Sequence, residues 1–258
     1  MSSKQSRVSS SRRQAVQEER KKKEQQKRLR QILYIAGGAL LIVIIAFAIN
    51  AFANQSSGKV AQGEIVTVTP KIRPQVDGHS MGDPNALVKI IEFSDFQCPY
   101  CKQFADSTEQ AIIDNFIATG KVHFTYHSMG NFVSQNIGLG GTESRDSAEA
   151  SYCAADQGKF WEYKDILFAN SLGEDQGFFA RARLEKMAEA IGLDVAQFNE
   201  CMDSKKFRDQ VNQDYKDGIA AGVTGTPSFV INGKLITGAQ PIEVFQQEIE
   251  AAIQAAGN

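Results

Sequence analysis

Two cysteines separated by two residues, Cys98 and Cys101, have the clearest potential for chemistry in this 258-residue sequence. They follow an apolar, β-rich run and open a segment with helical periodicity. In such a motif the two sulfurs approach each other across the first helical turn, where unpaired N–H groups and the helix dipole favour a thiolate on the first cysteine. The spacing therefore predicts thiol–disulfide exchange, with Cys98 as nucleophile and leaving group and Cys101 as the more buried resolving thiol.

The same pair could instead supply half of a zinc site. A structural zinc ion takes four ligands, so two more cysteines or histidines at suitable spacing would be needed. No second C-x-x-C motif follows in the sequence, and we assign no role to His123 and His127, which lie on a later β-rich run. We therefore expect a redox pair, with neither a metal nor a cofactor.

The elements around the cysteines predict a parallel βαβ unit. Residues 86–93 form an apolar run long enough for a buried strand. A helix is predicted from about Cys98 to Gly120, because apolar residues recur at helical spacing and a glycine commonly lies just past a helix end. Residues 122–127 then read as a second strand. Strand, helix and strand in this order are typical of α/β proteins.

The second half of the chain first turns helical and then returns to strands. Residues 143–221 read as nearly continuous helix interrupted by glycines. Two β-rich runs, 228–231 and 234–237, are joined by Asn-Gly, which is a strong hairpin signal. An amphipathic helix follows over about 241–255. The predicted α/β architecture is a βαβ half, a helical block and a ββα half.

Two motifs resemble those of the DsbA-like branch of the thioredoxin superfamily. The first is EFSDFQCPYC at residues 92–101, and the second is GTPSFVING at residues 225–233. The resemblance covers about residues 76–256. It implies a thioredoxin-like fold with a helical insertion, at about 140–222, between the βαβ and ββα halves.

The resemblance also implies which residues bind a substrate. It implies a cis peptide bond between Thr226 and Pro227 and places this loop beside the cysteines, where its backbone would bind an extended peptide. A cis X-Pro bond is uncommon and usually marks a tight functional turn. We therefore take Thr226 and Pro227, with Pro99 and Tyr100 between the cysteines, as substrate-binding candidates. The alternative is an ordinary turn proline before a hairpin.

A single carboxyl group lies within the first apolar strand. Glu92 precedes Cys98 by six residues and has Ile91 and Phe93 on either side. Burial disfavours the charged form of a carboxyl, so a raised pKa is expected. Glu92 resembles the buried acid that accepts or relays the proton of the second cysteine in this family, and we include it among the catalytic candidates. The alternative is that strand alternation directs it to solvent.

One position departs from the family pattern. Strongly oxidising members carry Pro-His between the two cysteines, whereas this chain has Pro99 and Tyr100. A histidine there would stabilise the thiolate through a charge or a hydrogen bond, and Tyr100 supplies neither charge nor the same geometry. The departure leaves the reduction potential open, and with it the direction of net electron flow.

The remaining two cysteines lie far apart in the sequence. Cys153 and Cys201 are 48 positions apart, and the residues around each have helical character. Disulfides persist outside the cytoplasm, so the pair favours a structural cross-link between two packed helices. Two buried free thiols are the alternative.

The N-terminal region indicates a membrane anchor. Residues 1–31 contain 11 basic and 3 acidic residues, a net charge of +8, whereas the remainder carries −10. Residues 32–52 contain no charged residue and are long enough to span a bilayer as one helix. The basic tail favours a cytoplasmic N-terminus and an extracytoplasmic domain, so we predict a topology signal and no nucleic-acid binding. Cleavage after Ala53, as in a signal peptide, is the alternative to an uncleaved signal anchor.

These assignments predict four segments and one leading function. The segments are the cytoplasmic tail (1–31), the transmembrane helix (32–52), a linker (53–80) and the DsbA-type domain (81–258). The resemblance implies that the domain oxidises thiols of exported proteins. A quinone-linked membrane partner, DsbB-like or vitamin K epoxide reductase-like, would then reoxidise it. A disulfide reductase or isomerase and a non-redox peptide-binding chaperone module are the alternatives.

Overall fold

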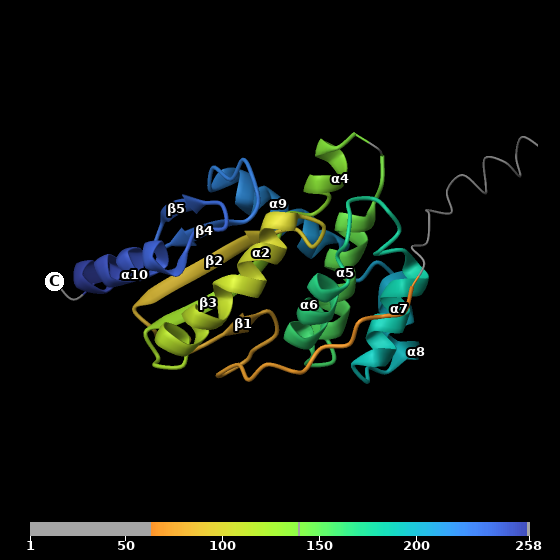
Figure 1. Cartoon of the computed structure of the whole chain (residues 1–258), viewed down its shortest axis with the longest axis horizontal. Coiled ribbons are helices and arrows are strands. Elements are labelled where there is room, and N and C mark those ends of the chain that lie inside the picture. Colours follow the sequence, from red (N-terminus) through yellow and green to blue (C-terminus); the bar gives the residue numbers. More distant parts are fainter. Residues whose placement is uncertain (1–62, 139, 257–258) are drawn as a thin grey trace, which may run out of the picture. The chain divides into compact units, whose positions relative to one another are not determined.

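The computed structural model of the chain describes residues 63–138 and 140–256. Its centre is a five-stranded mixed sheet with the strand order β1-β3-β2-β4-β5 (Figure 1). The strands are β1 (Ser80–Met81), β2 (Val88–Ser94), β3 (Val122–Ser128), β4 (Ser228–Ile231) and β5 (Lys234–Thr237). Only β2 and β3 run parallel among these neighbours, and the other three pairs are antiparallel. The predicted thioredoxin-like α/β class is thus confirmed.

The central strand β2 is buried along most of its length. It pairs with β3 on one edge and with β4 on the other, so that Glu92 lies opposite Tyr126 on β3 and Phe229 on β4. All three of these residues are fully buried. Strands covered on both faces are rich in branched apolar residues, and β2 follows that pattern at Val88, Ile90 and Ile91, whereas Lys89 is exposed and Glu92 and Ser94 are buried polar residues. The sheet thus places one carboxyl group in the centre of the core.

The segment after Cys98 differs from the single long helix that the sequence predicts. It divides into α2 (Pro99–Ser107), α3 (Glu109–Ile112) and a π-helical turn, η1 (Ile113–Ile117). The break lies at Thr108, a β-branched residue whose φ of −116° departs from helical values. Its hydroxyl donates a hydrogen bond to the carbonyl of Gln240, 3.2 Å away. This long-range contact is invisible to helical periodicity.

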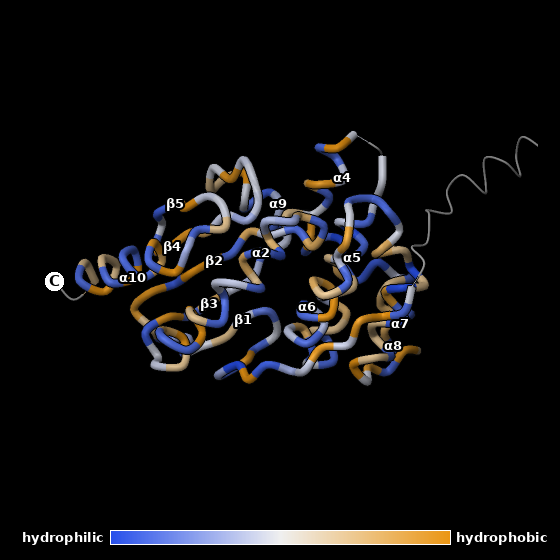
Figure 2. Tube along the Cα trace, in the orientation of Figure 1, coloured by the Kyte–Doolittle hydropathy of each residue, from blue (hydrophilic) through white to orange (hydrophobic). Residues whose placement is uncertain are grey.

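Six helices lie between β3 and β4 in the sequence of the described chain. They are α4 (Phe132–Asn136), α5 (Glu143–Ala155), α6 (Phe160–Ala169), α7 (Arg181–Ala190), α8 (Val195–Asp203) and α9 (Arg208–Ala220). In Figure 1, α5 to α8 lie together on one side of the sheet, away from the C-terminal helix α10 (Ile242–Ala256). Figure 2 shows α10 alternating between hydrophobic and hydrophilic residues, and its Phe245 and Ile249 are buried in the core.

A disulfide bond joins two of these helices. Cys153 on α5 and Cys201 on α8 are bonded with an S–S distance of 2.00 Å, and both are buried. The predicted cross-link is therefore confirmed, and the alternative of two free thiols is wrong. Cys98 and Cys101 are the free cysteines of the described chain.

Residues 63–80 fall in the range that the sequence assigns to a linker, yet they pack along the domain. The backbone of Val66 exchanges two hydrogen bonds of 2.9 Å with the side chain of Asn170. Farther along, the Arg73 side chain is buried against Asp165, and Ser80 pairs with Thr125 in the sheet. Specific polar contacts hold this segment, and low apolar periodicity gave no sign of them.

Across the described ranges, no helix combines the length and apolar character needed to cross a bilayer. The predicted tail (1–31), the predicted transmembrane helix (32–52) and the possible cleavage position after Ala53 lie outside these ranges.

Candidate active site

The Cys98 and Cys101 pair lies where β2 passes into α2. Cys98 is the N-cap of α2 with extended backbone angles, φ −70° and ψ 121°, and Pro99 is the first helical residue. Proline is well suited to this position because its fixed φ matches the helix and its missing N–H would have no partner there. Cys101, one turn into the helix, is fully buried. The local sequence thus places one sulfur at the helix N-terminus and the other behind it.

The two thiols have pKa values shifted in opposite directions. A hydrogen bond from the Cys101 thiol, together with contributions from Thr226 and from backbone N–H groups of the first turn, lowers the pKa of Cys98 to about 7. Burial, together with the neighbouring Cys98 sulfur, raises the pKa of Cys101 well above its usual value. The thiolate is the nucleophile in disulfide exchange. Cys98 is therefore the attacking sulfur and Cys101 the resolving one.

The loop before β4 covers the active sulfur. The Thr226–Pro227 peptide bond is cis, as the sequence motif implies. The Cys98 Sγ donates a hydrogen bond to the Thr226 carbonyl at 3.2 Å, and Pro227 is buried beside it. A position at the helix N-terminus predicts an exposed nucleophile, but with this loop against the sulfur only 5% of Cys98 is accessible.

Tyr100 is 62% exposed, and Pro99 before it is exposed as well. Pro99 beside it lines a pocket of about 500 Å³ whose far wall is the loop after α6. In that loop Leu172 is 66% exposed although it is apolar. Sequence reasoning missed Leu172, because a lone leucine between serine and glycine carries no pattern. The pocket thus has apolar surface from Pro99 and Leu172 between the start of α2 and this loop.

Glu92 is fully buried, so the alternative that it points to solvent is wrong. Burial raises the pKa of its carboxyl to about 7, against the opposing effect of the Lys164 charge. Neither of its oxygens has a hydrogen-bond partner within the described chain. Burial, with smaller contributions from Glu92 and Cys101, raises the pKa of the Tyr126 hydroxyl well above its usual value, so the acid and the resolving thiol both lie near this phenol.

A second buried carboxyl, Asp95, holds the turn that carries the cysteines. Its carboxylate accepts hydrogen bonds from the backbone N–H of Val133 at 3.0 Å and from the Ser144 hydroxyl at 2.8 Å. Its own backbone N–H points to Cys101 Sγ at 3.5 Å, and its carbonyl accepts from the Cys98 N–H at 3.0 Å. Asp95 thus ties the redox turn to α4 and α5.

The residue directly before the nucleophile, Gln97, extends this network. Its amide donates to the hydroxyls of Ser134 and Ser144 at 2.7 and 2.9 Å, and its carbonyl oxygen accepts from the Asp175 N–H at 2.5 Å. Asp95 and Gln97 both lie in the motif at 92–101. That two polar residues alternate with apolar ones just before Cys98 could have indicated a buried hydrogen-bond network, but the sequence analysis assigned them no role.

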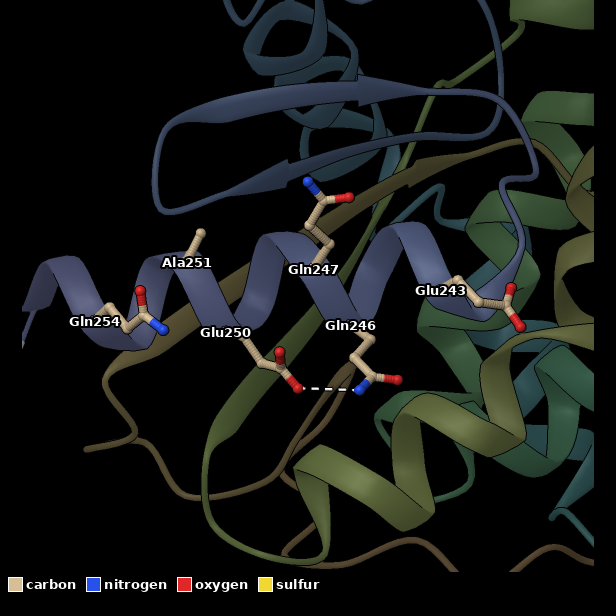
Figure 3. Close-up of a pocket in the computed structure, with 6 residues that line it drawn as sticks. All are labelled: Glu243, Gln246, Gln247, Glu250, Ala251 and Gln254. Atoms are coloured by element: carbon tan, nitrogen blue, oxygen red, sulfur yellow. Dashed lines mark hydrogen bonds between the residues drawn. The ribbon is translucent and has the colours of Figure 1, made fainter.

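Two further features of the described chain lack the properties of a catalytic site. Within the described ranges, no group of three or more His, Cys, Asp or Glu side chains is arranged to hold a metal ion. A shallow pocket of about 520 Å³ lies on α10 (Figure 3), and Gln246 donates to Glu250 there at 3.0 Å. All of its lining residues come from one helix, and none is a nucleophile: Glu243, Gln246, Gln247, Glu250, Ala251 and Gln254. The cysteine pair remains the candidate active site.

Comparisons with known proteins agree with this geometry. The sequence profile of the family described as Thioredoxin matches residues 75–251. The chain is 28% identical over 161 residues to the probable disulfide bond formation protein D of Bacillus anthracis, covering 60% of this chain and 70% of that protein. Among solved structures, oxidised BdbD from Bacillus subtilis superposes with a TM-score of 0.60 at 24% identity, covering 70% of this chain and 96% of that one.

A third relative is much longer than this chain. The Na(+)/H(+) antiporter NhaA 3 of Salinispora tropica is 29% identical over 194 residues, which is 74% of this chain and 27% of the antiporter. The chain thus spans about a quarter of the length of such curated relatives. The profile match extends over both sequence motifs and the helical block between them. The chain therefore belongs to the thioredoxin family, and its fold is the DsbA-type form.

Proposed function

We propose that the protein is a protein-disulfide oxidoreductase that transfers the Cys98–Cys101 disulfide to cysteines of exported proteins. The observation that carries this proposal is the pair of neighbouring thiols with oppositely shifted pKa values beside the cis-proline loop. Neither a zinc ligand pair nor a structural disulfide requires one thiol with a lowered pKa next to a second thiol with a raised pKa. The pair instead has the asymmetry that exchange through a mixed disulfide requires.

The exchange proceeds in two balanced steps. A substrate thiolate attacks the Cys98 sulfur, the Cys98–Cys101 bond breaks, and Cys101 leaves as a thiolate that takes up a proton, for which the Glu92 carboxyl is the buried source. A second substrate thiolate then attacks the substrate sulfur of the mixed disulfide and releases Cys98. Two electrons pass to the pair. The low pKa of Cys98 makes it a good leaving group in the second step.

The name of the Bacillus anthracis relative, a probable disulfide bond formation protein, supports the oxidising direction. Tyr100 in place of histidine supports a weaker oxidant than the Pro-His members. The reduction potential of the Cys98–Cys101 couple distinguishes the directions: an oxidase needs a potential well above the roughly −270 mV of thioredoxin. A potential at or below that value would instead assign a reductase. Continued peptide binding with no exchange would assign the chaperone alternative.

The pH dependence of alkylation tests the site directly. In the reduced full-length chain, Cys98 should be alkylated with a midpoint of about pH 7, because the Cys101 thiol stabilises its thiolate. Cys101 should react only at much higher pH, since it is fully buried. The measurement is alkylation rate against pH, read by mass spectrometry of the two cysteines. As a control, Cys101→Ala removes the hydrogen bond and should raise the Cys98 midpoint. A lower midpoint at Cys101 than at Cys98 would contradict the assignment.

Catalytic turnover as an oxidase requires reoxidation, because each substrate disulfide leaves the Cys98–Cys101 pair reduced. We propose a quinone-linked membrane protein, DsbB-like or vitamin K epoxide reductase-like, as the electron acceptor. The Cys98 thiolate would attack a disulfide of such a partner from the side that the substrate uses, since Cys101 is inaccessible. Cys101 would then attack Cys98 in the mixed disulfide, release the reduced partner and restore the Cys98–Cys101 bond.

We further propose that residues 32–52 anchor the protein as a single-pass membrane protein, with the tail in the cytoplasm and the domain outside. The uncharged run behind a tail of net charge +8 supports this topology. Protease added to intact cells stripped of their outer layers should digest the domain that contains Trp161 and leave the tail. Immunoblotting of both ends measures the result. Digestion of the tail with protection of the domain would reverse the proposed orientation.

A further inference from the structure

Four buried charged side chains form a network next to Glu92. Lys164 on α6 forms an ion pair with Glu109 on α3, and Glu109 in turn lies 3.4 Å from the guanidinium of Arg73. Arg73 also forms a two-point contact with Asp165, at 2.7 and 2.9 Å. Each of these four side chains is at most 6% exposed. The network joins the segment before the sheet to the centre of the core.

The charges of the network balance without Glu92. Two cations, Lys164 and Arg73, face two carboxylates, Glu109 and Asp165, and charged side chains at such depth need a partner. Lys71, at the rim, adds a contact of 3.8 Å to Asp165, but its side chain is 35% exposed. An ionised Glu92 would therefore be a surplus buried negative charge.

The groups around Glu92 that favour its ionised form do not outweigh the effect of its burial. Lys164 is the cation that acts on it, Glu109 opposes the ionised form, and Ser94 contributes only a hydroxyl. From the neighbouring strands it faces the Tyr126 phenol and the Phe229 ring, and Tyr126 also faces Cys101 of α2. The ionised form of Glu92 thus depends on Lys164, and Lys164 is already paired with the carboxylate of Glu109.

We propose that Glu109, held by Lys164 and Arg73, keeps Glu92 neutral by engaging the charge of Lys164, so that Glu92 holds a proton for Cys101. Glu109, Lys164 and Arg73 are then positioning residues, which act through Glu92 without touching a substrate. The destination of the proton rests on the proposed disulfide exchange. The effect of the network on the charge of Glu92 does not, and it can be measured separately.

The decisive change is Glu109→Gln, which keeps the size of the side chain and removes its charge. Of the carboxylates that act on Lys164, Glu92 and Asp165 then remain, and Asp165 is already paired with Arg73, so Glu92 should ionise at lower pH. A shift of about one pH unit or more is expected for an opposite charge at this range. The measurement is infrared difference titration of the protonated carboxyl band in the reduced full-length chain, assigned by its loss in Glu92→Gln.

A matched control is available on α5. Glu149 is also a buried carboxylate paired with an arginine, Arg208, but it does not act on Glu92. Glu149→Gln should lower thermal stability as Glu109→Gln does and leave the Glu92 midpoint unchanged. A purely structural role for Glu109 would make the two variants alike in both measurements.

A second pair of variants covers the case in which Glu109→Gln does not fold. Arg73→Gln leaves Lys164 as the one buried cation for two carboxylates, so the Glu92 midpoint should rise, whereas Arg73→Lys should keep it near the wild-type value. The inference would be overturned if the Glu92 midpoint did not move in Glu109→Gln or in Arg73→Gln, provided that the variant folds. It would also be overturned if Lys164 lost its proton in place of Glu92. If the Glu92 midpoint shifts as expected but the wild-type protein has no exchange activity, the inference about Glu109 stands and the proposed function is refuted.

Discussion

Cys101→Ser is expected to turn the protein into a trap for its substrates. The Cys98 thiolate can still attack a substrate disulfide, but Cys101 is no longer present to attack Cys98 and release the substrate, so mixed disulfides on Cys98 should accumulate. Cys98→Ser should capture almost none, because Cys101 is fully buried and its pKa is raised well above normal. Both variants should lose exchange activity to the uncatalysed background. The measurement is non-reducing electrophoresis of full-length variants from membranes, followed by mass spectrometry of the captured proteins.

Two controls make the trapping experiment specific. The double variant Cys98→Ser, Cys101→Ser should capture nothing, and reduction should release every partner from Cys101→Ser. Captured proteins should be exported and contain cysteines. Equal trapping by Cys98→Ser would show that the nucleophile is wrongly assigned.

Cys201→Ser should destabilise the domain strongly and spare the active site. The disulfide closes a loop of 48 residues between α5 and α8, and the chain-entropy model gives about 4 kcal/mol for a loop of this length. For a domain of this size that corresponds to a fall in Tm of roughly 10 °C. Thermal unfolding with calorimetric detection measures the loss. Alkylation of Cys98 against pH should keep its midpoint of about 7.

The matched control for this experiment is Cys153→Ser together with Cys201→Ser. It removes the same bond without leaving a free thiol, so its Tm should agree with that of the single variant. Peptide mapping of the wild-type protein, after selective reduction of the active pair, should still recover Cys153 linked to Cys201. Alkylation of both without a strong reductant would contradict the structural role.

The features that could be predicted from the sequence are those encoded by short local patterns. The C-x-x-C motif, the Thr226–Pro227 motif and the Asn-Gly hairpin each occupy a few adjacent residues, and the structure places the first two in contact. The disulfide was also predictable, because two distant cysteines in a domain that is predicted to be exported favour a structural cross-link.

The features that could not be predicted depend on partners far away in the chain. Lysine side chains normally face water, but Lys164 lies in the buried helix α6, where it is paired with Glu109, 55 positions away. The break at Thr108 depends on a carbonyl 132 positions away. Helical periodicity describes only neighbours within a turn or two, so neither contact leaves a trace in it.

The recessed position of Cys98 limits the shape of the substrates that can exchange disulfides with the protein. With 5% of the residue accessible and the Thr226 carbonyl against its sulfur, a cysteine on a broad rigid surface would be stopped by the surrounding loops before the sulfurs met. A single strand of flexible chain can enter where a folded face cannot. Oxidation would therefore come before the substrate folds, so that the timing of export, more than the sequence around a cysteine, would decide which thiols are joined.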